Sequence, residues 1–470
     1  CGTIVLEKNN PLGYHALNPK TFSFEINRIL DYAKTSKFKD QIEQYVNFLL
    51  QRFDPREVDI EIINDLEKLR GKQGYFENRM SGKYNVRRNK KLSKDVKIKC
   101  LAPWSHLHVN STGEFGLCQV SNVKNGNNTF EEHWNSVKMK NIRISMINGN
   151  LNPLICNRCI SKSSTFSPML EKKNNFALPF ISEILDSTKI NGETTFDPRS
   201  VEIRMNDCNL ACRICNDASS SKIRDLKKAA GLNVSSVSNK SLHDYGMTEE
   251  RISKIENVLW SGGEPFMSSI HWELMEKLVE MGRTDVKVIY NTNFTFPEES
   301  FERAIKLLTN FKNVKILASL DGTGEDVEYL RKGMNYSDFC KNLEIFKEKL
   351  PHVKIAINFT ATSMGIFTLD GVIQLCLDHN LEFEGRNAIL PDRSEMSINA
   401  ITPEALNDAL NRSTAVASGT VLEPVIDKFV KFLRSKYMSV IFDRDLLKKN
   451  DLVFGQEEYF EKRMKGLFNV

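Results

Sequence analysis

The sequence predicts an α/β protein built around a partial parallel barrel of six strand-helix units. From Arg199 onward, short β-branched runs alternate with segments whose apolar residues recur at helical spacing. Polar residues and glycines follow the strands, at the edge where such barrels place functional groups. The expected strands are 200–206, 256–261, 286–291, 314–319, 353–359 and 381–389. The expected helices include 219–230, 268–282, 298–310, 335–349 and 367–379.

Length and composition suit a protein of two or three domains with a large core. The chain has 470 residues, of which 41% are hydrophobic and 27% are charged, and its net charge is +5. No apolar run approaches about 18 residues, so we expect no membrane-spanning helix. The first residues lack the pattern of a secretory signal. Seven of the ten cysteines fall into two groups with metal-ligand spacing, which favours a reducing compartment, the cytoplasm.

Residues 1–99 are expected to form a small helical region with a basic linker. Residues 22–33, 39–53 and 58–69 carry apolar positions at helical spacing. The stretch from Arg79 to Lys99 is basic. Such a run is expected to be a solvated linker, with contact to RNA phosphates or to an acidic peptide as the alternatives.

Residues 100–198 are expected to form a second region that holds a metal or a cluster. Two alternating runs flank an Asn-Ser-Thr-Gly turn at 110–113, which predicts a hairpin, and a helix is expected at 130–147. Four cysteines in the pattern C-x17-C and C-x2-C can enclose one iron-sulfur cluster or one zinc ion. These cysteines are Cys100, Cys118, Cys156 and Cys159. Since four thiols complete a site, His106, His108 and His133 are expected to pack or be exposed, not to be ligands.

Three further cysteines follow the first barrel strand. Cys208, Cys212 and Cys215 form the pattern C-x3-C-x2-C on a strand-to-helix loop. Three thiolates suit an iron-sulfur cluster, with structural zinc as the alternative. A cluster of four irons held by three cysteines leaves one iron open to a small molecule. About fifty residues later, Gly262-Gly-Glu-Pro265 follows the second strand, where two glycines let the backbone approach a ligand closely.

The two motifs together resemble the radical S-adenosylmethionine (SAM) superfamily. The resemblance implies a partial (β/α)6 TIM-like barrel at 199–391 and a [4Fe-4S] cluster on the three cysteines. It also implies that the open iron chelates SAM, which is cleaved by one electron to a 5′-deoxyadenosyl radical that abstracts hydrogen from a substrate. An electron donor such as flavodoxin or ferredoxin is therefore expected.

The same resemblance implies a set of cofactor-binding residues. The segment Gly262, Gly263, Glu264 and Pro265 is expected to bind the amino group of SAM. Ser319 and Arg331 are expected to hold its ribose or carboxylate. Asn291, Asn293 and Asn358 are expected to meet the ribose or the substrate. Each of these polar residues also suits a strand-end cap or turn.

The region at 100–198 resembles a twitch domain, the shortened relative of the SPASM domain. This implies an auxiliary [4Fe-4S] cluster that is fully ligated and therefore suited to electron transfer. In better-known members the twitch segment follows the barrel, whereas here it precedes it. Residues 392–470 are expected to form a helical closure of the open side of the barrel, with helices near 403–412 and 420–436.

The expected function is that of a radical SAM enzyme acting on a peptide or protein. The alternative is an enzyme that oxidises or rearranges a small molecule such as a sugar or an amino alcohol. A nucleic-acid-modifying enzyme that uses the basic stretch 79–99 and a non-catalytic iron-sulfur binding module are less favoured. We expect no membrane partner.

Overall fold

The computed structural model describes residues 98, 100–118, 129–148, 177–237, 240–387, 394–438, 453–455 and 457–467. The chain divides into two compact units, residues 1–98 with 144–154 and residues 99–143 with 155–470. The fold below is that of the second unit. The expected helices at 22–69, the basic stretch up to residue 97, Cys156 and Cys159 lie outside the described residues.

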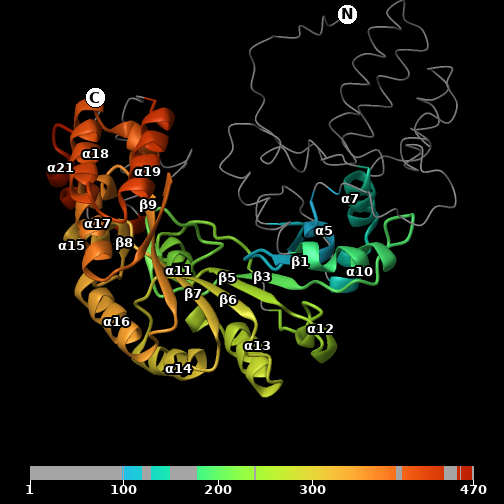
Figure 1. Ribbon diagram of the computed structural model, residues 1–470. Coiled ribbons are helices and arrows are strands. Elements are labelled where there is room, and N and C mark those ends of the chain that lie inside the picture. The colour runs from blue at the N-terminus through green and yellow to red at the C-terminus, as the bar shows by residue number, and fades with distance from the viewer. Residues whose placement is uncertain are drawn as a thin grey trace, which may run out of the picture. The chain divides into compact units, whose positions relative to one another are not determined.

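An eight-stranded sheet forms the centre of the second unit (Figure 1). Its order is β10-β9-β7-β6-β5-β3-β1-β2. All neighbouring strands are parallel except the hairpin β1-β2. The strands are β1 (His106–Val109), β2 (Phe115–Gly116), β3 (Ser200–Met205), β5 (Asn257–Gly262), β6 (Lys287–Thr292), β7 (Asn313–Ser319), β9 (Lys354–Ala361) and β10 (Glu382–Asn387). The six strands predicted for the barrel, and the α/β fold class, are confirmed.

The hairpin strand β1 extends the barrel sheet, which the sequence did not predict. It pairs with β3 in parallel, so that Leu107 lies opposite Val201 and His108 lies opposite Glu202. The pairing places apolar residues of both strands on one face of the sheet. A short antiparallel pair, β4 (Ala211–Cys212) with β8 (Arg331–Lys332), stands apart from the main sheet.

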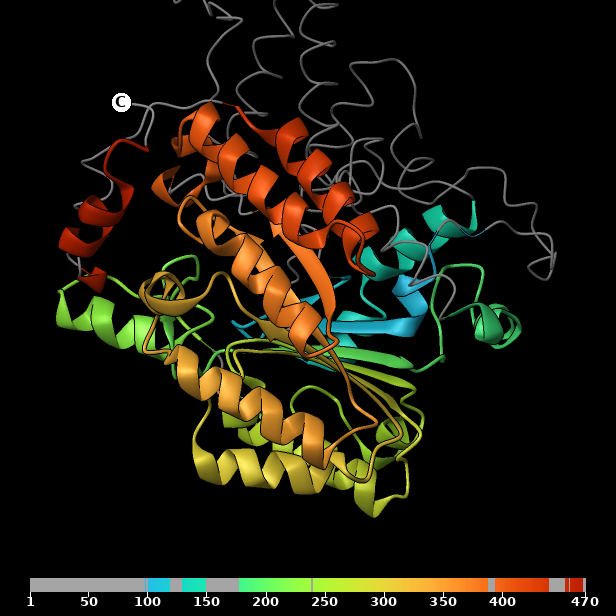
Figure 2. The same ribbon diagram turned by 60° about the vertical axis from the view of Figure 1, so that its left-hand side comes forward.

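Helices connect the strands and cover one face of the sheet (Figures 1 and 2). The predicted barrel helices appear as α11 (Ser221–Ala229), α13 (Ser269–Glu280), α14 (Glu298–Leu308), α16 (Tyr336–Lys349) and α17 (Leu369–Asp378). Shorter helices are α5 (Ala102–Ser105), α6 (Phe130–Trp134), α10 (Ile181–Asp186), α12 (Glu249–Ser253) and α15 (Gly324–Leu330). The others are α7 (Val137–Ile147), α18 (Pro403–Ala417), α19 (Glu423–Lys436) and α21 (Glu457–Met464).

Several helix starts are set by local capping. The Ser220 hydroxyl accepts a hydrogen bond from the Ile223 amide at 3.2 Å and so caps α11, the helix that follows the three cysteines. Thr402 caps α18 in the same way, and Pro403 occupies its first turn. The caps therefore fix where the chain leaves the strand-end loops.

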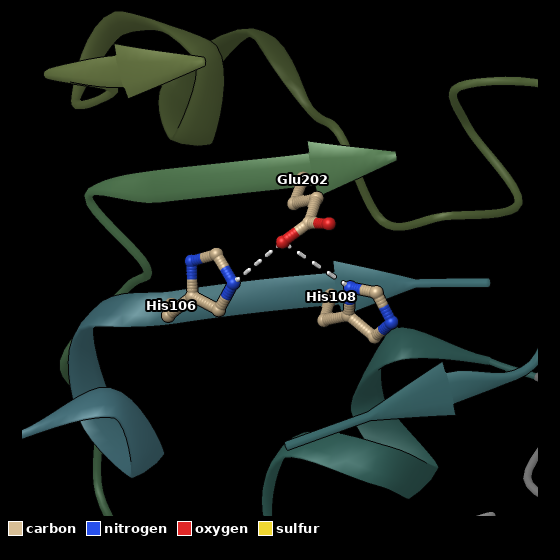
Figure 3. Close-up of side chains that lie close together, drawn as sticks. All are labelled: His106, His108 and Glu202. Atoms are coloured by element: carbon tan, nitrogen blue, oxygen red, sulfur yellow. Dashed lines mark ion pairs between the residues drawn. The ribbon is translucent and has the colours of Figure 1, made fainter. Parts of the chain in front are cut away.

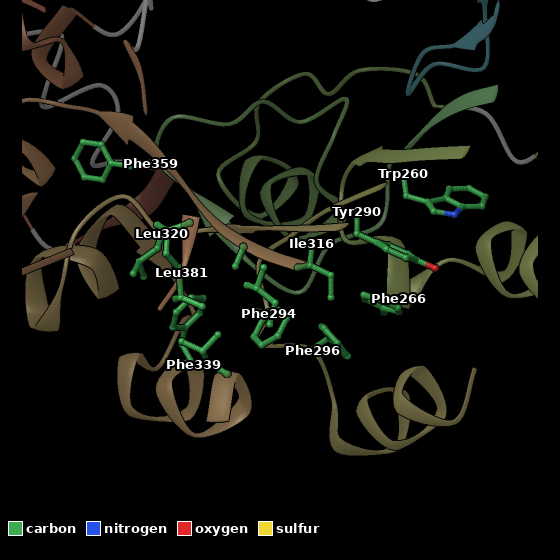
Figure 4. Close-up of a cluster of buried hydrophobic side chains, with 14 of the residues drawn as sticks. Trp260, Phe266, Tyr290, Phe294, Phe296, Ile316, Leu320, Phe339, Phe359 and Leu381 are labelled. Carbon is green, nitrogen blue, oxygen red and sulfur yellow. The ribbon is translucent and has the colours of Figure 1, made fainter. Parts of the chain in front are cut away.

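The two faces of the sheet differ in chemistry. Figure 4 shows the apolar face, where Trp260, Tyr290 and Ile316 pack with side chains such as Phe294 and Phe339. We call the opposite face the polar face. Leu259, Ile289 and Leu317 also lie on it, and its polar residues are His106, His108, Glu202, Ser261, Asn291, Lys315, Ser319, Asn358 and Glu384. Because parallel barrels place helices outside, the polar face is the inner one.

Candidate active site

The three barrel cysteines lie together on the loop between β3 and α11, at the carboxyl end of the sheet. Each is partly buried. The Cys208 amide donates a hydrogen bond to the Ser221 hydroxyl at 3.0 Å, and that hydroxyl donates to the Cys208 carbonyl at 3.1 Å. The Cys215 amide donates to the Cys212 carbonyl at 2.9 Å. The loop is thus fixed by its own turn and by the first residue of α11.

Two N–H donors lie close to these sulfurs. Asn293 Nδ2 is 3.8 Å from Cys208 Sγ, and Arg331 Nη1 is 3.9 Å from Cys212 Sγ. Burial, with the nearby Cys212, raises the pKa of Cys208 above its usual range. Burial also raises the pKa of Cys212 to about 12, against the effect of Arg331. Thiols in this setting ionise together only when a cation replaces their protons, and three sulfur donors suit an iron-sulfur cluster.

The glycine pair at 262–263 packs directly on the cysteine loop. The Gly263 amide donates to the Met205 carbonyl at 2.8 Å, and the Glu264 amide donates to the Asp207 carbonyl at 2.6 Å. A Cβ atom on Gly263 would lie 2.0 Å from the Asp207 carbonyl oxygen, and one on Gly262 would lie 2.4 Å from that of Met205. The pair is therefore required by backbone packing. Its expected contact with SAM stays a prediction, as does that of Pro265.

Glu264 is fully buried and linked to the end of β6. Its carboxylate accepts hydrogen bonds from the Thr292 hydroxyl and the Asn293 amide, both at 2.8 Å, and from the Phe266 amide at 3.3 Å. Burial raises the pKa of Glu264 to about 7, although these hydrogen bonds favour the ionised form. The carboxylate positions Asn293, whose side chain reaches both Cys208 and Asn209.

The other three predicted polar residues form a separate group on the polar face. The Ser319 hydroxyl and Asn358 Nδ2 both donate to Asn291 Oδ1 at 3.0 Å. These residues come from the neighbouring strands β7, β9 and β6. The structure thus divides the predicted contacts into one group beside Cys208 and one group around Asn291.

Arg331 is buried and already has an anionic partner in its own chain. Its Nη2 lies 2.8 Å from Asp321 Oδ2, and Asp321 Oδ1 accepts from the Thr360 amide at 2.9 Å. Because β8 pairs with β4, the same residue lies opposite Cys212. The Arg331 guanidinium is therefore already paired with Asp321. Its expected binding to the ribose or carboxylate of SAM stays a prediction.

Residues near the carboxyl terminus also contact the cysteine loop, which sequence reasoning missed. Phe454 packs against Ala211 and Ile223. The guanidinium of Arg213, which lies between Cys212 and Cys215, is 5.3 Å from the centroid of the Phe454 ring. No spacing pattern links positions more than 200 residues apart, so this contact carried no signal in the sequence.

In the hairpin region, the structure describes two of the four predicted ligands. Cys100 is buried and Cys118 is partly buried. His106, His108 and His133 are all buried, and the first two gather around Glu202, which the sequence did not single out (Figure 3). A surface hollow lined by residues that include Lys354 and Glu382 lies at the amino ends of β9 and β10, away from this site.

Two family models match the chain where these features lie. Residues 203–361 match the model described as the radical SAM superfamily, which begins in β3 and ends with β9. This chain contains a radical SAM domain. Residues 100–160 match a SPASM model, described as an iron-sulfur cluster-binding domain. The cofactors are therefore SAM and a [4Fe-4S] cluster, with further iron-sulfur binding in the SPASM region.

Comparison with curated proteins gave no match. Among solved structures, this chain is similar to Streptococcus suis SuiB bound to S-adenosylmethionine, with 15% identity, a TM-score of 0.36, and coverage of 59% of this chain and 63% of that chain. SuiB bound to precursor peptide SuiA has 18% identity, a TM-score of 0.34, and coverage of 54% of this chain and 53% of that chain. Escherichia coli coproporphyrinogen III oxidase (HemN) has 14% identity, a TM-score of 0.31, and coverage of 47% of this chain and 51% of that chain. The chain thus spans less than two thirds of each of these proteins.

In the part of the chain that the structure describes, no helix is both long and apolar enough to cross a bilayer.

Proposed function

We propose that this radical SAM enzyme abstracts hydrogen from a side chain of a peptide or protein. The observation that supports the radical chemistry is the cysteine loop at the carboxyl edge of a parallel sheet, packed on Gly262 and Gly263. Cys208, Cys212 and Cys215 would hold the cluster. When bound, the cluster and SAM supply the reductive cleavage and the hydrogen-abstracting radical.

The residues around the loop prepare the site for these groups. Asn293 and Arg331 direct N–H groups toward the sulfurs of Cys208 and Cys212, and hydrogen bonds to cluster sulfurs tune reduction potential. The Glu264 carboxylate holds Asn293 in place by accepting a hydrogen bond from the backbone amide of Asn293. The group of Asn291, Ser319 and Asn358 offers amide and hydroxyl groups for the ribose or the substrate on the polar face.

The SPASM region would act as an N-terminal twitch-like domain with one auxiliary [4Fe-4S] cluster. Its ligands would be Cys100, Cys118, Cys156 and Cys159. A cluster with four protein ligands has no open iron, so it suits electron transfer from the substrate radical. An electron donor of the flavodoxin or ferredoxin type would reduce the barrel cluster. A peptide substrate is supported by the resemblance to enzymes with SPASM or twitch domains, many of which modify peptides.

A small molecule is the second candidate substrate. The polar face presents uncharged hydrogen-bonding groups in Asn291, Ser319 and Asn358, and it presents charges in Lys315, which lies 2.9 Å from Glu384. A sugar or an amino alcohol would find hydrogen-bond partners there.

Anaerobic reconstitution tests the proposal. Two clusters predict about eight irons per chain, and 5′-deoxyadenosine should be released when SAM and a reductant are added. Replacing Cys208, Cys212 and Cys215 together by alanine should remove about four irons and abolish release. Cys340→Ala, a thiol outside both groups, is the control and should change neither. Release that survives the triple replacement refutes the proposal.

The substrate is tested separately with the same reconstituted protein. Candidate peptides and candidate sugars or amino alcohols are added in parallel, and 5′-deoxyadenosine release is compared with the uncoupled rate. Stimulation by peptides with a matching mass change in the peptide supports the first candidate. Stimulation by small molecules alone replaces it with the second.

A further inference from the structure

Two histidines and one glutamate form a buried group on the polar face, which we call the His-Glu cluster. His106 and His108 come from β1 and Glu202 comes from the adjacent strand β3 (Figure 3). Their exposed fractions are 5%, 6% and 1%. Alternate residues of β1 lie on the same face, so the two histidines flank the glutamate of the paired strand. None of the three belongs to the cysteine motifs.

The spacing of the three side chains fits ligands around one ion. His106 Nε2 and His108 Nδ1 each lie 3.5 Å from Glu202 Oε2, and the three ligand atoms lie within 4.8 Å of one another. Good N–H···O hydrogen bonds are shorter, about 2.7–3.2 Å. Ligands about 2.1 Å from a tetrahedral metal ion are about 3.4 Å from each other. The observed distances therefore match a shared ion better than direct hydrogen bonds.

The partners that the structure gives the Glu202 carboxylate are the two imidazoles, which carry a positive charge only when they are protonated. Among the described residues, no lysine or arginine forms an ion pair with it, and Ser261 Oγ donates to Oε1 only at 3.4 Å. A buried carboxylate is costly unless a cation and good hydrogen bonds accompany it. A metal ion between the imidazoles and the carboxylate would supply that cation.

The imidazoles are oriented for ligation. Ser200 Oγ lies 3.0 Å from His106 Nδ1 and accepts from Asn257 Nδ2 at 2.9 Å, so Nδ1 faces Ser200 while Nε2 faces Glu202. His108 Nδ1 is buried, faces Glu202, and has no hydrogen-bond partner among the described residues. A second contact that fixes the ring is typical of metal-binding histidines.

We propose that the His-Glu cluster binds one divalent transition metal ion, with His106 Nε2, His108 Nδ1 and a Glu202 carboxylate oxygen as ligands. Two imidazoles and one carboxylate suit zinc, iron(II) or manganese, whereas calcium and magnesium prefer all-oxygen sites. The ion ties β1 to β3. It thereby fixes the hairpin, which lies between Cys100 and Cys118 in the chain, to the first strand of the barrel, whatever the substrate of the enzyme is.

Zinc binding to the whole 470-residue chain tests the proposal. The protein is reconstituted with its iron-sulfur clusters, freed of loosely bound metal and titrated with zinc alone. The wild-type chain should bind one zinc beyond its cluster iron. Glu202→Gln and His108→Gln should each weaken that binding at least about tenfold. His271→Gln, which changes a buried histidine outside the cluster, is the matched control and should bind as the wild type does.

Cobalt(II) separates this site from the cysteine sites, which also bind zinc. Cobalt on nitrogen and oxygen ligands gives visible d–d bands without the sulfur-to-metal charge-transfer band of a thiolate site. The wild-type holoprotein should show the first spectrum. A wild-type chain that binds no zinc beyond its clusters, or a Glu202→Gln chain with unchanged affinity, overturns the proposal. Should a variant fail to fold, the wild-type stoichiometry and spectrum decide alone.

Discussion

The two faces of the central sheet divide the tasks of the molecule between them. The apolar face carries large side chains such as Trp260 and Tyr290, which are fully buried. The polar face carries residues that bond to one another across neighbouring strands, as Asn291 does with Ser319 and Asn358. Since alternate residues of one strand serve both faces, neighbouring substitutions should separate stability from chemistry.

The largest effect on stability is expected on the apolar face. Trp260→Ala removes a fully buried ring that packs edge-on against His271, and it should lower the free energy of unfolding by about 3–5 kcal/mol. Ser261→Ala, the next residue on the polar face, should cost about 1 kcal/mol, because its hydrogen bond to Glu202 is long. Urea unfolding of both variants measures the difference. Equal losses would contradict the division between the faces.

Glu264 should make stability depend on pH. Its pKa is about 7 when folded against an ordinary value of 4.5, so the folded chain binds the proton more tightly. The free energy of unfolding should therefore fall as the pH rises from about 4.5 to about 7, by up to about 3 kcal/mol. Unfolding of cluster-free protein at about pH 5 and about pH 8 measures this. In Glu264→Gln this part of the dependence should be absent.

A smaller effect is expected at the glycine pair. Gly263→Ala places a Cβ atom against the Asp207 carbonyl and should cost about 1–3 kcal/mol, while also displacing the cysteine loop and lowering its iron content. Gly231→Ala is the control, because its Cβ meets open space and only its positive φ is strained. Full iron content in Gly263→Ala would show that the loop tolerates the displacement.

The smallest effect on stability is expected for Ser319, which donates a hydrogen bond to Asn291 on the polar face. Ser319→Ala removes one hydrogen bond, while Asn358 continues to donate to Asn291, so the cost should be about 1 kcal/mol or less. If the proposed role holds, the same change should raise the dissociation constant of SAM or of the substrate, which equilibrium binding to the reconstituted enzyme measures. Unchanged binding would assign Ser319 to the sheet alone.

The sequence predicted the barrel well because its signals are local. Each strand and helix shows its own periodicity, and the spacing of Cys208, Cys212 and Cys215 lies within one loop. Pairings between distant segments carry no such signal. The contact between Phe454 and Ala211 and the parallel pairing of β1 with β3 both depend on packing of residues far apart in the chain.

The candidate site was predictable only in part for the same reason. The sequence named Asn293, Glu264 and Arg331, but it did not predict that Glu264 Oε2 accepts from the Asn293 amide or that Asp321 Oδ2 pairs with Arg331. It expected His106 and His108 to pack or be exposed, because four thiols complete a site, and it gave no sign of Glu202, which is almost a hundred positions away. Spacing predicted candidate ligands within one loop, whereas the residues that surround that loop come from different strands.

The pairing of β1 with β3 has a practical consequence for dissecting the protein. The match to the radical SAM model begins at residue 203, inside β3, so a fragment cut there loses β1 and part of its partner strand. β5, the strand that pairs with β3, would then lie at the edge of the sheet with unpaired main-chain N–H and C=O groups. Such an edge can pair with other chains. Fragments meant for expression should therefore begin ahead of Cys100 and keep the hairpin.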